Sequence, residues 1–409
     1  MSAPPVPGTE RTNRWPRTLP LIVVGAILSV AVGVVLGSAA PPGEPPRIYL
    51  EAPDDAVAGR PLDVFVSVDV PATVRVRYAD TTIEEVTQDL RVSLLAEAGT
   101  WDLEVEAEDA AGRVSREERT IRAAWPPAPR LTSTDTLTVG DALTLRLAWH
   151  GDPARVPMLE VVDAFLELDG RRLAGLLHDG ELTALIPVPL QSDPGVRTVR
   201  GVVIDAFGDE HEVLGVVTIE ANPHPVQELN VAASTLSVVT PAGRELEAET
   251  LERAFAAVGP EPRWARTFVL PLEGRATSAF GLPRRYAPGG PISFHLGTDI
   301  AAPTGTAIHA TNDGVVRVSG MYPIKGGLVV LDHGFGVTSL YFHQSALAVA
   351  EGDVVERGQV IGYVGSTGLS TGPHLHWEMR VDGVPTAPLA WVDRRWPGGP
   401  IERDEEEGP

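Results

Sequence analysis

Alternating hydrophobic and polar residues recur along most of this chain. Short alternating runs such as DVFVSVDV and TVRVRY occupy residues 47–124, and a second series that includes LTLRLAWH occupies residues 128–221. Gly, Pro and Asp residues separate the runs, and period-2 alternation at this spacing is typical of antiparallel strands that bury one face. The pattern predicts two immunoglobulin-like β-sandwich domains, with the linker WPPAPR between them.

The pattern changes after residue 222. Residues 222–262 form a linker that contains a predicted helix, because several apolar residues can share one helix face and Gly259 with Pro260 can end it. These apolar residues are Leu246, Leu251, Ala254, Phe255 and Val258. Residues 263–395 are rich in strand patterns again, such as GVVRVSG, GLVVLDHG, VTSLYFH and HLHWEMRV. This region predicts a domain of mainly antiparallel sheet.

An uncharged apolar run from Leu19 to Leu36 follows the residues Arg11, Arg14 and Arg17. A helix of about 18 residues nearly spans a hydrocarbon core of ~30 Å, and flanking arginines stay in the cytoplasm. The run predicts a membrane anchor or signal sequence at residues 18–38, after a cytoplasmic segment at residues 1–17. Its length exceeds the roughly 7 to 15 apolar residues of a signal peptide, which favours a retained anchor. Cleavage after Ala39 is the alternative and would release a secreted protein.

The predicted location is therefore outside the cytoplasm, with the helix in the inner or cytoplasmic membrane. Residues 39–46 include PPGEPP, which predicts a stiff Pro-rich spacer between the membrane and the first sandwich. The chain as a whole is predicted to be mainly β. Its parts are the membrane helix, the two sandwiches, the linker helix and the antiparallel C-terminal domain.

Composition limits the chemistry that the chain can perform. The 409 residues are 43% hydrophobic and 22% charged, which is typical of globular domains. The chain has no cysteine, so disulfides and thiolate metal sites are excluded, and any metal must be held by His, Asp or Glu. The net charge of -22 excludes a nucleic-acid partner on electrostatic grounds. This acidity lies in residues 18–262 and in the acidic tail at residues 396–409.

Histidines are concentrated near the C-terminal end, where six of the ten lie between His295 and His376. His374 and His376 are two apart in a predicted strand, so both side chains point to the same face. His295 and Asp299 are four apart across a glycine-containing turn that can wrap a metal ion. Catalytic zinc sites commonly use three such ligands and leave a fourth position for water.

With the YFH that ends in His343, these motifs stand in the order HxxxD, YxH and HxH. The segment from Phe268 to Trp391 resembles the lysostaphin/LytM-type zinc metallopeptidases that cut peptidoglycan. The matching pieces are SAFG, HLGTDIAAPTGT, DGVV, LDHGFGVTSLYFH and GDVVERGQVIGYVGSTGLSTGPHLHWE. Members often carry a basic residue two positions after the FG. Pro283 stands there in this chain and Arg284 follows, which puts an arginine contact with substrate in doubt.

The resemblance implies that His295, Asp299 and His376 are ligands of Zn²⁺ and that His343 and His374 are catalytic residues without a metal bond. One of these two histidines would stabilise the developing negative charge, and the other would move the proton; the sequence leaves open which does which. The implied activity is an exported zinc-dependent endopeptidase that hydrolyses stem or cross-link peptides of peptidoglycan. Both a glycine bridge and a bond between D-amino acids remain open as the target.

The alternative function is a non-catalytic LytM-type regulator that binds and activates another cell-wall hydrolase. Regulatory relatives lack metal ligands, so the complete set in this chain favours the enzyme. The sandwiches can be spacers, lids over the peptidase groove, or docking modules for envelope proteins, and the spacer role is the default expectation.

Overall fold

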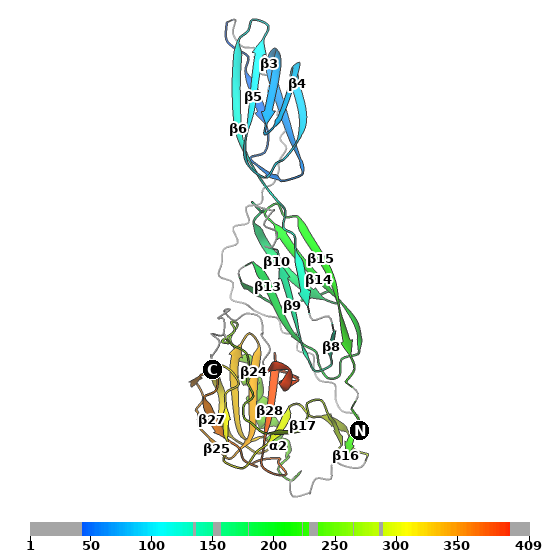
Figure 1. Ribbon diagram of the computed structural model, residues 1–409, viewed down its shortest axis with the longest axis vertical. Helices are drawn as coiled ribbons and strands as arrows, with labels where there is room; N and C mark the ends of the chain where they lie inside the picture. The colour runs from blue at the N-terminus through cyan, green and yellow to red at the C-terminus, as the bar shows by residue number, and fades with distance from the viewer. Residues whose placement is uncertain are drawn as a thin grey trace, which may run out of the picture.

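The computed structural model describes residues 43–133, 136–149, 157–178, 180–222, 224–228, 236–264, 266–285 and 289–392. They form three β-rich units that follow one another along the long axis of the molecule (Figure 1). A fold that is mainly β was predicted, and the structure confirms it. The predicted membrane helix at residues 18–38 and the acidic tail at residues 396–409 lie outside the described residues. Within the described ranges, no helix is both long and apolar enough to cross a membrane.

The first unit is one six-stranded sheet that surrounds an apolar core. The strand order is β1-β3-β5-β6-β2, and β4 pairs with β3. Inward residues such as Val64 and Val66 alternate with outward ones along β3, as the period-2 pattern predicted. The strands are β1 (Ile48–Glu51), β2 (Asp55–Val57), β3 (Pro61–Tyr78), β4 (Thr81–Leu95), β5 (Gly99–Asp109) and β6 (Val114–Ala124).

The second unit has two sheets that enclose a core of Leu, Val and Ile side chains. The sheet orders are β11-β10-β14-β15-β8 and β12-β13-β9-β7. The immunoglobulin-like character of both units stays a prediction. The strands are β7 (Arg130–Ser133), β8 (Thr136–Thr138), β9 (Ala142–Ala148), β10 (Val161–Leu168), β11 (Arg171–Arg172), β12 (Leu176–His178), β13 (Glu181–Pro187), β14 (Gly195–Asp205) and β15 (Glu210–Glu220).

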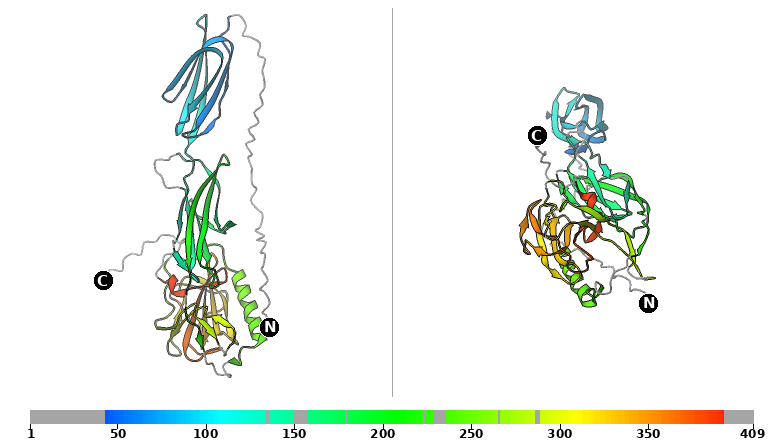
Figure 2. Two further views of the ribbon diagram at one scale, coloured as in Figure 1. Left: turned by 90° about the vertical axis from the view of Figure 1, so that its right-hand side faces the viewer. Right: turned by 60° about the horizontal axis from the view of Figure 1, so that its bottom comes forward.

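Helix α2 (Pro241–Ala256) lies in the predicted linker and covers one side of the C-terminal domain (Figure 2). It begins after Thr240, whose side chain accepts a hydrogen bond from the Gly243 N–H at 3.0 Å, with a proline in the first turn. Leu251 and Ala254 are buried against strands of the C-terminal sheet, as their shared face predicted. Leu246 was predicted to lie on that face and is instead exposed.

The C-terminal domain is built on an eight-stranded sheet of order β17-β20-β28-β24-β23-β22-β26, with β29 paired to β28. Small sheets of order β16-β18-β19 and β21-β27-β25 flank it. Its strand pairs are antiparallel, as predicted, except that β16 of the linker pairs parallel with β18. The elements are β16 (Gln227–Glu228), β17 (Arg275–Ser278), β18 (Pro283–Arg285), β19 (Ile292–Phe294), β20 (Thr298–Ala301), β21 (Ala307–His309), β22 (Gly314–Tyr322), β23 (Gly326–Gly334), β24 (Val337–Gln344), β25 (Ala346–Leu347), β26 (Val354–Val355), β27 (Val360–Tyr363), β28 (His374–Val381), β29 (Val384–Thr386) and the 3-10 helix η1 (Pro388–Trp391).

The second unit packs directly on the C-terminal domain. Ala142 and Leu185 belong to the same buried cluster as the core of the C-terminal domain. The Ala387 N–H donates a hydrogen bond of 2.8 Å to the carbonyl of Gly140. Gly140 has a φ of +95°, and a Cβ atom there would lie 2.4 Å from the ring of Phe280. The two units therefore share apolar packing, and the contact falls on the SAFG segment near the candidate site.

Candidate metal centre

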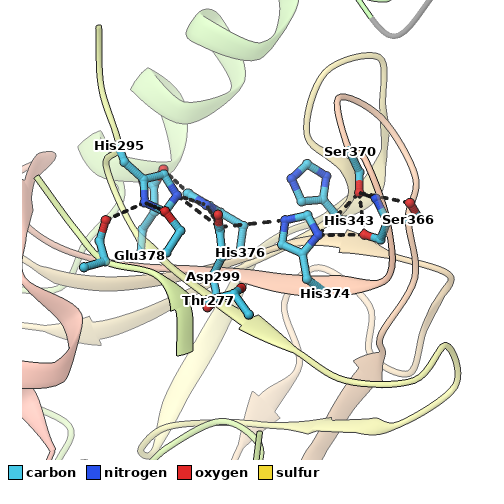
Figure 3. Close-up of polar contacts among 12 residues, drawn as sticks. Thr277, His295, Asp299, His343, Ser366, Ser370, His374, His376 and Glu378 are labelled. Carbon is cyan, nitrogen blue, oxygen red and sulfur yellow. Dashed lines mark hydrogen bonds and ion pairs between the residues drawn. The ribbon is translucent and has the colours of Figure 1, made fainter. Parts of the chain in front are cut away.

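Pairing between β20 and β28 places two of the predicted ligands opposite each other. The register pairs Asp299 with His376 and Ala301 with His374. Side chains of alternate residues on one strand share a face, so His374 and His376 project from the same side of β28, beside Asp299 (Figure 3). That loop requires Gly297, because a Cβ there would lie 2.7 Å from His376 Nε2.

His295, Asp299 and His376 converge at one point, as the sequence predicted they would. His295 Nε2 lies 3.0 Å from Asp299 Oδ1 and 3.0 Å from His376 Nδ1, and His376 Nδ1 lies 2.8 Å from Asp299 Oδ1. Their candidate ligand atoms all lie within 4.8 Å of one another. Two imidazole nitrogens and one carboxylate oxygen form the kind of set that a catalytic zinc site uses, and the residues therefore fit this ion.

Hydrogen bonds behind each imidazole fix which nitrogen faces the centre. His295 Nδ1 lies 2.7 Å from the carbonyl oxygen of Ala279, and His376 Nε2 lies 3.1 Å from Glu378 Oε1. Glu378 is in turn held by Arg380, whose Nε lies 2.7 Å from Oε2. A metal-bound histidine almost always donates its other N–H to such an acceptor. Glu378 was not among the predicted site residues, although it follows His376 by two residues and so shares its face of β28.

Arg284 contacts Asp299 at Oδ2, the carboxylate oxygen that does not face the two histidines. Its Nη2 atom lies 3.4 Å from Asp299 Oδ2, and it also contacts Ser278 Oγ. The side chain is mostly buried. The arginine that follows the SAFG segment therefore contacts the carboxylate of a candidate ligand, which sequence reasoning did not predict.

His343 and His374 lie beside the three converging residues, and their ring centroids are 4.8 Å apart. His343 Nδ1 is 2.8 Å from the carbonyl oxygen of Thr367, and His374 Nδ1 is 2.8 Å from that of Gly372. His374 Nε2 lies 3.8 Å from Asp299 Oδ1. Since a carbonyl accepts a hydrogen bond from each Nδ1–H, the Nε2 atom of each neutral ring keeps a free lone pair.

Burial and local charges shift the pKa values of this cluster. Burial would raise the pKa of Asp299, but hydrogen bonds from His295 and His376 hold that pKa well below its usual range. Burial would lower the pKa of His376, yet its hydrogen bonds to Asp299 and Glu378 raise it to about 9. The pKa of His295 is lowered, chiefly by burial. Burial, together with the charges of His376 and His374, lowers the pKa of His343 to about 3. A metal ion at the centre would replace the proton on His376.

His333 lies near the end of β23 and has partners within the core. It is fully buried, with Nδ1 at 2.6 Å from the Asp313 carbonyl oxygen and Nε2 at 2.8 Å from Ser339 Oγ. It is not part of the converging group of candidate ligands. Its role is therefore in the core of the domain.

Known proteins match the C-terminal part of the chain. Residues 293–388 match the family model described as Peptidase family M23. The DD-carboxypeptidase/endopeptidase Mpg of Neisseria meningitidis serogroup B is 50% identical over 97 residues, which cover 24% of this chain and 22% of that protein. The peptidoglycan DD-endopeptidase ShyA of Vibrio cholerae serotype O1 is 39% identical over 138 residues, covering 34% of this chain and 30% of that protein.

Among solved structures, this chain is similar to the catalytic domain of the antimicrobial peptidase lysostaphin from Staphylococcus simulans. The two sequences are 28% identical over a match that covers 30% of this chain and 93% of the lysostaphin domain, with a TM-score of 0.27. The matches to Mpg and ShyA span only 22% and 30% of the length of those relatives. The family match and these relatives confirm that the C-terminal domain is of the LytM peptidase type.

Proposed function

We propose that this protein is a zinc-dependent endopeptidase that hydrolyses peptide bonds in peptidoglycan. One observation carries the proposal: His295, Asp299 and His376 converge within hydrogen-bond distance, with His343 and His374 beside them. A non-catalytic regulator that binds and activates another cell-wall hydrolase would have no need for two further imidazoles next to a complete ligand set. The arrangement therefore favours the enzyme over the regulator.

His295 Nε2, Asp299 Oδ1 and His376 Nδ1 would hold the ion. Bound Zn²⁺ supplies Lewis-acid chemistry, because it polarises a carbonyl and lowers the pKa of water from 15.7 toward ~7. Ala279 and Glu378 set the tautomers of the two ligand histidines. Asp299 stays ionised over the whole neutral range, because its pKa is held low.

The remaining chemistry is proton transfer by His343 and His374. Hydrolysis adds water to the amide carbon, breaks the C–N bond and delivers a proton to the leaving amine. Each neutral ring can take the proton of the attacking water at Nε2 and return it to the amine nitrogen, since its Nδ1–H is already bonded to a carbonyl. After it takes that proton, the same nitrogen can donate a hydrogen bond to the developing oxyanion.

The substrate class is inferred from the relatives. Mpg is named a DD-carboxypeptidase/endopeptidase and ShyA a peptidoglycan DD-endopeptidase. The family match covers the converging residues, and the names of these relatives support peptidoglycan as substrate and favour a bond between D-amino acids over a glycine bridge. We also propose that the protein is exported and held at the membrane by residues 18–38, on the evidence of the apolar run after three arginines.

Cleavage of defined wall fragments tests the function directly. The purified full chain, a His376→Ala variant and the chelator-treated chain are incubated with dimeric peptide-cross-linked fragments, and the products are identified by mass spectrometry. We expect monomers from the untreated chain alone, with activity restored when Zn²⁺ is added back after chelation. Full zinc occupancy without any new amine terminus would overturn the proposal.

A further inference from the structure

Glu247 is a buried carboxylate on α2, outside the residues that match the family model. Only 2% of its surface is exposed, so its charge requires partners inside the protein. Oε1 accepts hydrogen bonds from the N–H groups of Ile324 at 2.6 Å and Lys325 at 3.1 Å. Oε2 lies 2.9 Å from Lys325 Nζ. The helix therefore fixes the turn between β22 and β23 through one side chain.

The same turn also accepts hydrogen bonds from two segments of the candidate site. The carbonyl of Lys325 accepts the backbone N–H of His343 at 2.8 Å. The carbonyl of Ile324 accepts the N–H of Leu369 at 2.7 Å, in the loop that precedes β28. The two residues that bond to Glu247 through their N–H groups thus bond to the site through their carbonyl groups.

The backbone of His343 needs such support. Its φ of +63° lies in the left-handed region, where a residue with a side chain is strained unless its surroundings fix it. The ring is fixed by Thr367, whose carbonyl oxygen lies 2.8 Å from His343 Nδ1. Thr367 Oγ1 accepts the N–H of Gly327, two residues after Lys325 in the same hairpin, at 2.9 Å. Both the backbone and the ring of His343 therefore depend on the hairpin that Glu247 holds.

We propose that Glu247 is a positioning residue for His343, acting through the turn at Ile324 and Lys325. This inference rests on the proposed function, since it assumes that His343 takes part in peptide hydrolysis. It assigns α2 to the catalytic apparatus rather than to a passive linker. A misplacement of a catalytic group by about 1 Å can cost about a hundredfold in rate, so a residue that does not touch substrate can still control kcat.

The test compares Glu247→Gln and Glu247→Ala in the full chain. Gln keeps an oxygen for the two N–H groups and loses the charge and the oxygen that accept from Lys325 Nζ, and since the turn itself stays bonded we expect kcat within about threefold of the unmodified chain. Ala leaves the two N–H groups without their acceptor, and we expect kcat to fall about a hundredfold with KM unchanged. Zn²⁺ affinity, measured by chelator competition, should change by less than about threefold, because no ligand bonds to this turn. Glu249→Ala, on the exposed side of α2, is the matched control and should behave as the unmodified chain.

Amide hydrogen exchange separates positioning from general loss of structure. In Glu247→Ala we expect the amides of His343 and Leu369 to exchange at least about tenfold faster, while the amide of Val330 in the sheet core keeps its rate. Uniform acceleration of all three amides, or a kcat that matches the Glu249→Ala control, would overturn the proposal. If the unmodified chain cleaves no wall peptide, the proposed function fails, while the exchange rates at His343 still decide whether Glu247 positions it.

Discussion

Glu378 Oε1 lies 3.1 Å from His376 Nε2, on the side of the imidazole that faces away from the three converging ligand atoms. Burial would raise the pKa of Glu378, but Arg380 and His376 lower it to about 2, so the carboxylate is ionised at neutral pH. An ionised acceptor behind the ring increases the electron density at Nδ1. We therefore propose that Glu378 strengthens His376 as a ligand of Zn²⁺.

From this pair we predict that Glu378→Gln lowers the affinity for Zn²⁺ by about 10- to 100-fold, the range typical of such supporting residues. Competition with a chelator measures the dissociation constant. Glu351→Gln is the matched control, because Glu351 is an exposed carboxylate of the same domain. Equal affinities of the two variants would refute the role that we assign to Glu378.

The lowered pKa of His333 predicts that the stability of the folded chain depends on pH. Burial lowers the pKa of its ring to about 4, compared with 6.5 for an exposed histidine. The unfolded chain therefore binds a proton that the folded chain does not bind between these two values. Stability from this group is complete above pH 6.5 and is lost as pH falls toward 4. The loss amounts to about 3 kcal/mol, because a tenfold change in a protonation equilibrium corresponds to about 1.4 kcal/mol.

Denaturant unfolding at several pH values measures how the free energy of unfolding changes with pH. His333→Asn can keep one donor and one acceptor for Asp313 and Ser339 but does not titrate. We expect the free energy of unfolding to fall less steeply between pH 6.5 and 4 in this variant than in the unmodified chain. Parallel curves for the two proteins would contradict the prediction, whatever their difference in absolute stability.

The resemblance to the LytM-type peptidases predicted which residues form the candidate ligand triad and which two histidines lie beside it, and local patterns account for part of their geometry. The HxH spacing sets a shared strand face, and the HxxxD spacing spans one glycine turn, so the geometry follows from a few neighbouring residues. Glu378 obeys the same alternation as His376 and could have been found by extending it by one step.

The contacts of Glu247 and Arg284 could not be predicted from local spacing. Glu247 accepts a hydrogen bond from a turn 77 residues later in the chain. Arg284 on β18 contacts Asp299 on β20, a strand of another sheet. Such contacts depend on how separate elements pack, and no spacing within the sequence encodes them. For the same reason, the contact of Gly140 with Phe280 could not be anticipated.

Truncation of the chain distinguishes the roles that were left open for the second unit. A protein that begins at Arg263 lacks both Gly140 and Glu247, and it exposes the ring of Phe280 to solvent. We expect it to be less stable and less active than the full chain, as judged by thermal unfolding and by cleavage of wall fragments. A protein that begins at residue 128 should keep both properties. Higher activity of the shorter protein would instead favour the lid role.

Gly140 provides a point test of the contact between the second unit and the C-terminal domain. A Cβ atom at residue 140 would lie 2.4 Å from a ring atom of Phe280, whereas one at Gly170 meets nothing within 4 Å. Both glycines have positive φ, of +95° and +76°, so replacement by alanine strains both backbones in a similar way. The difference between Gly140→Ala and Gly170→Ala therefore isolates the packing contact.

We expect Gly140→Ala to lower the free energy of unfolding by about 2 kcal/mol more than Gly170→Ala, within the usual range for overpacking. The change should also reach the metal centre, because Ala279 next to Phe280 accepts the hydrogen bond from His295 Nδ1 at 2.7 Å. Zn²⁺ affinity should therefore fall in Gly140→Ala and not in Gly170→Ala. Denaturant unfolding and chelator competition measure the two effects. Identical results for the two variants would mean that the second unit rests on the C-terminal domain without supporting its ligands.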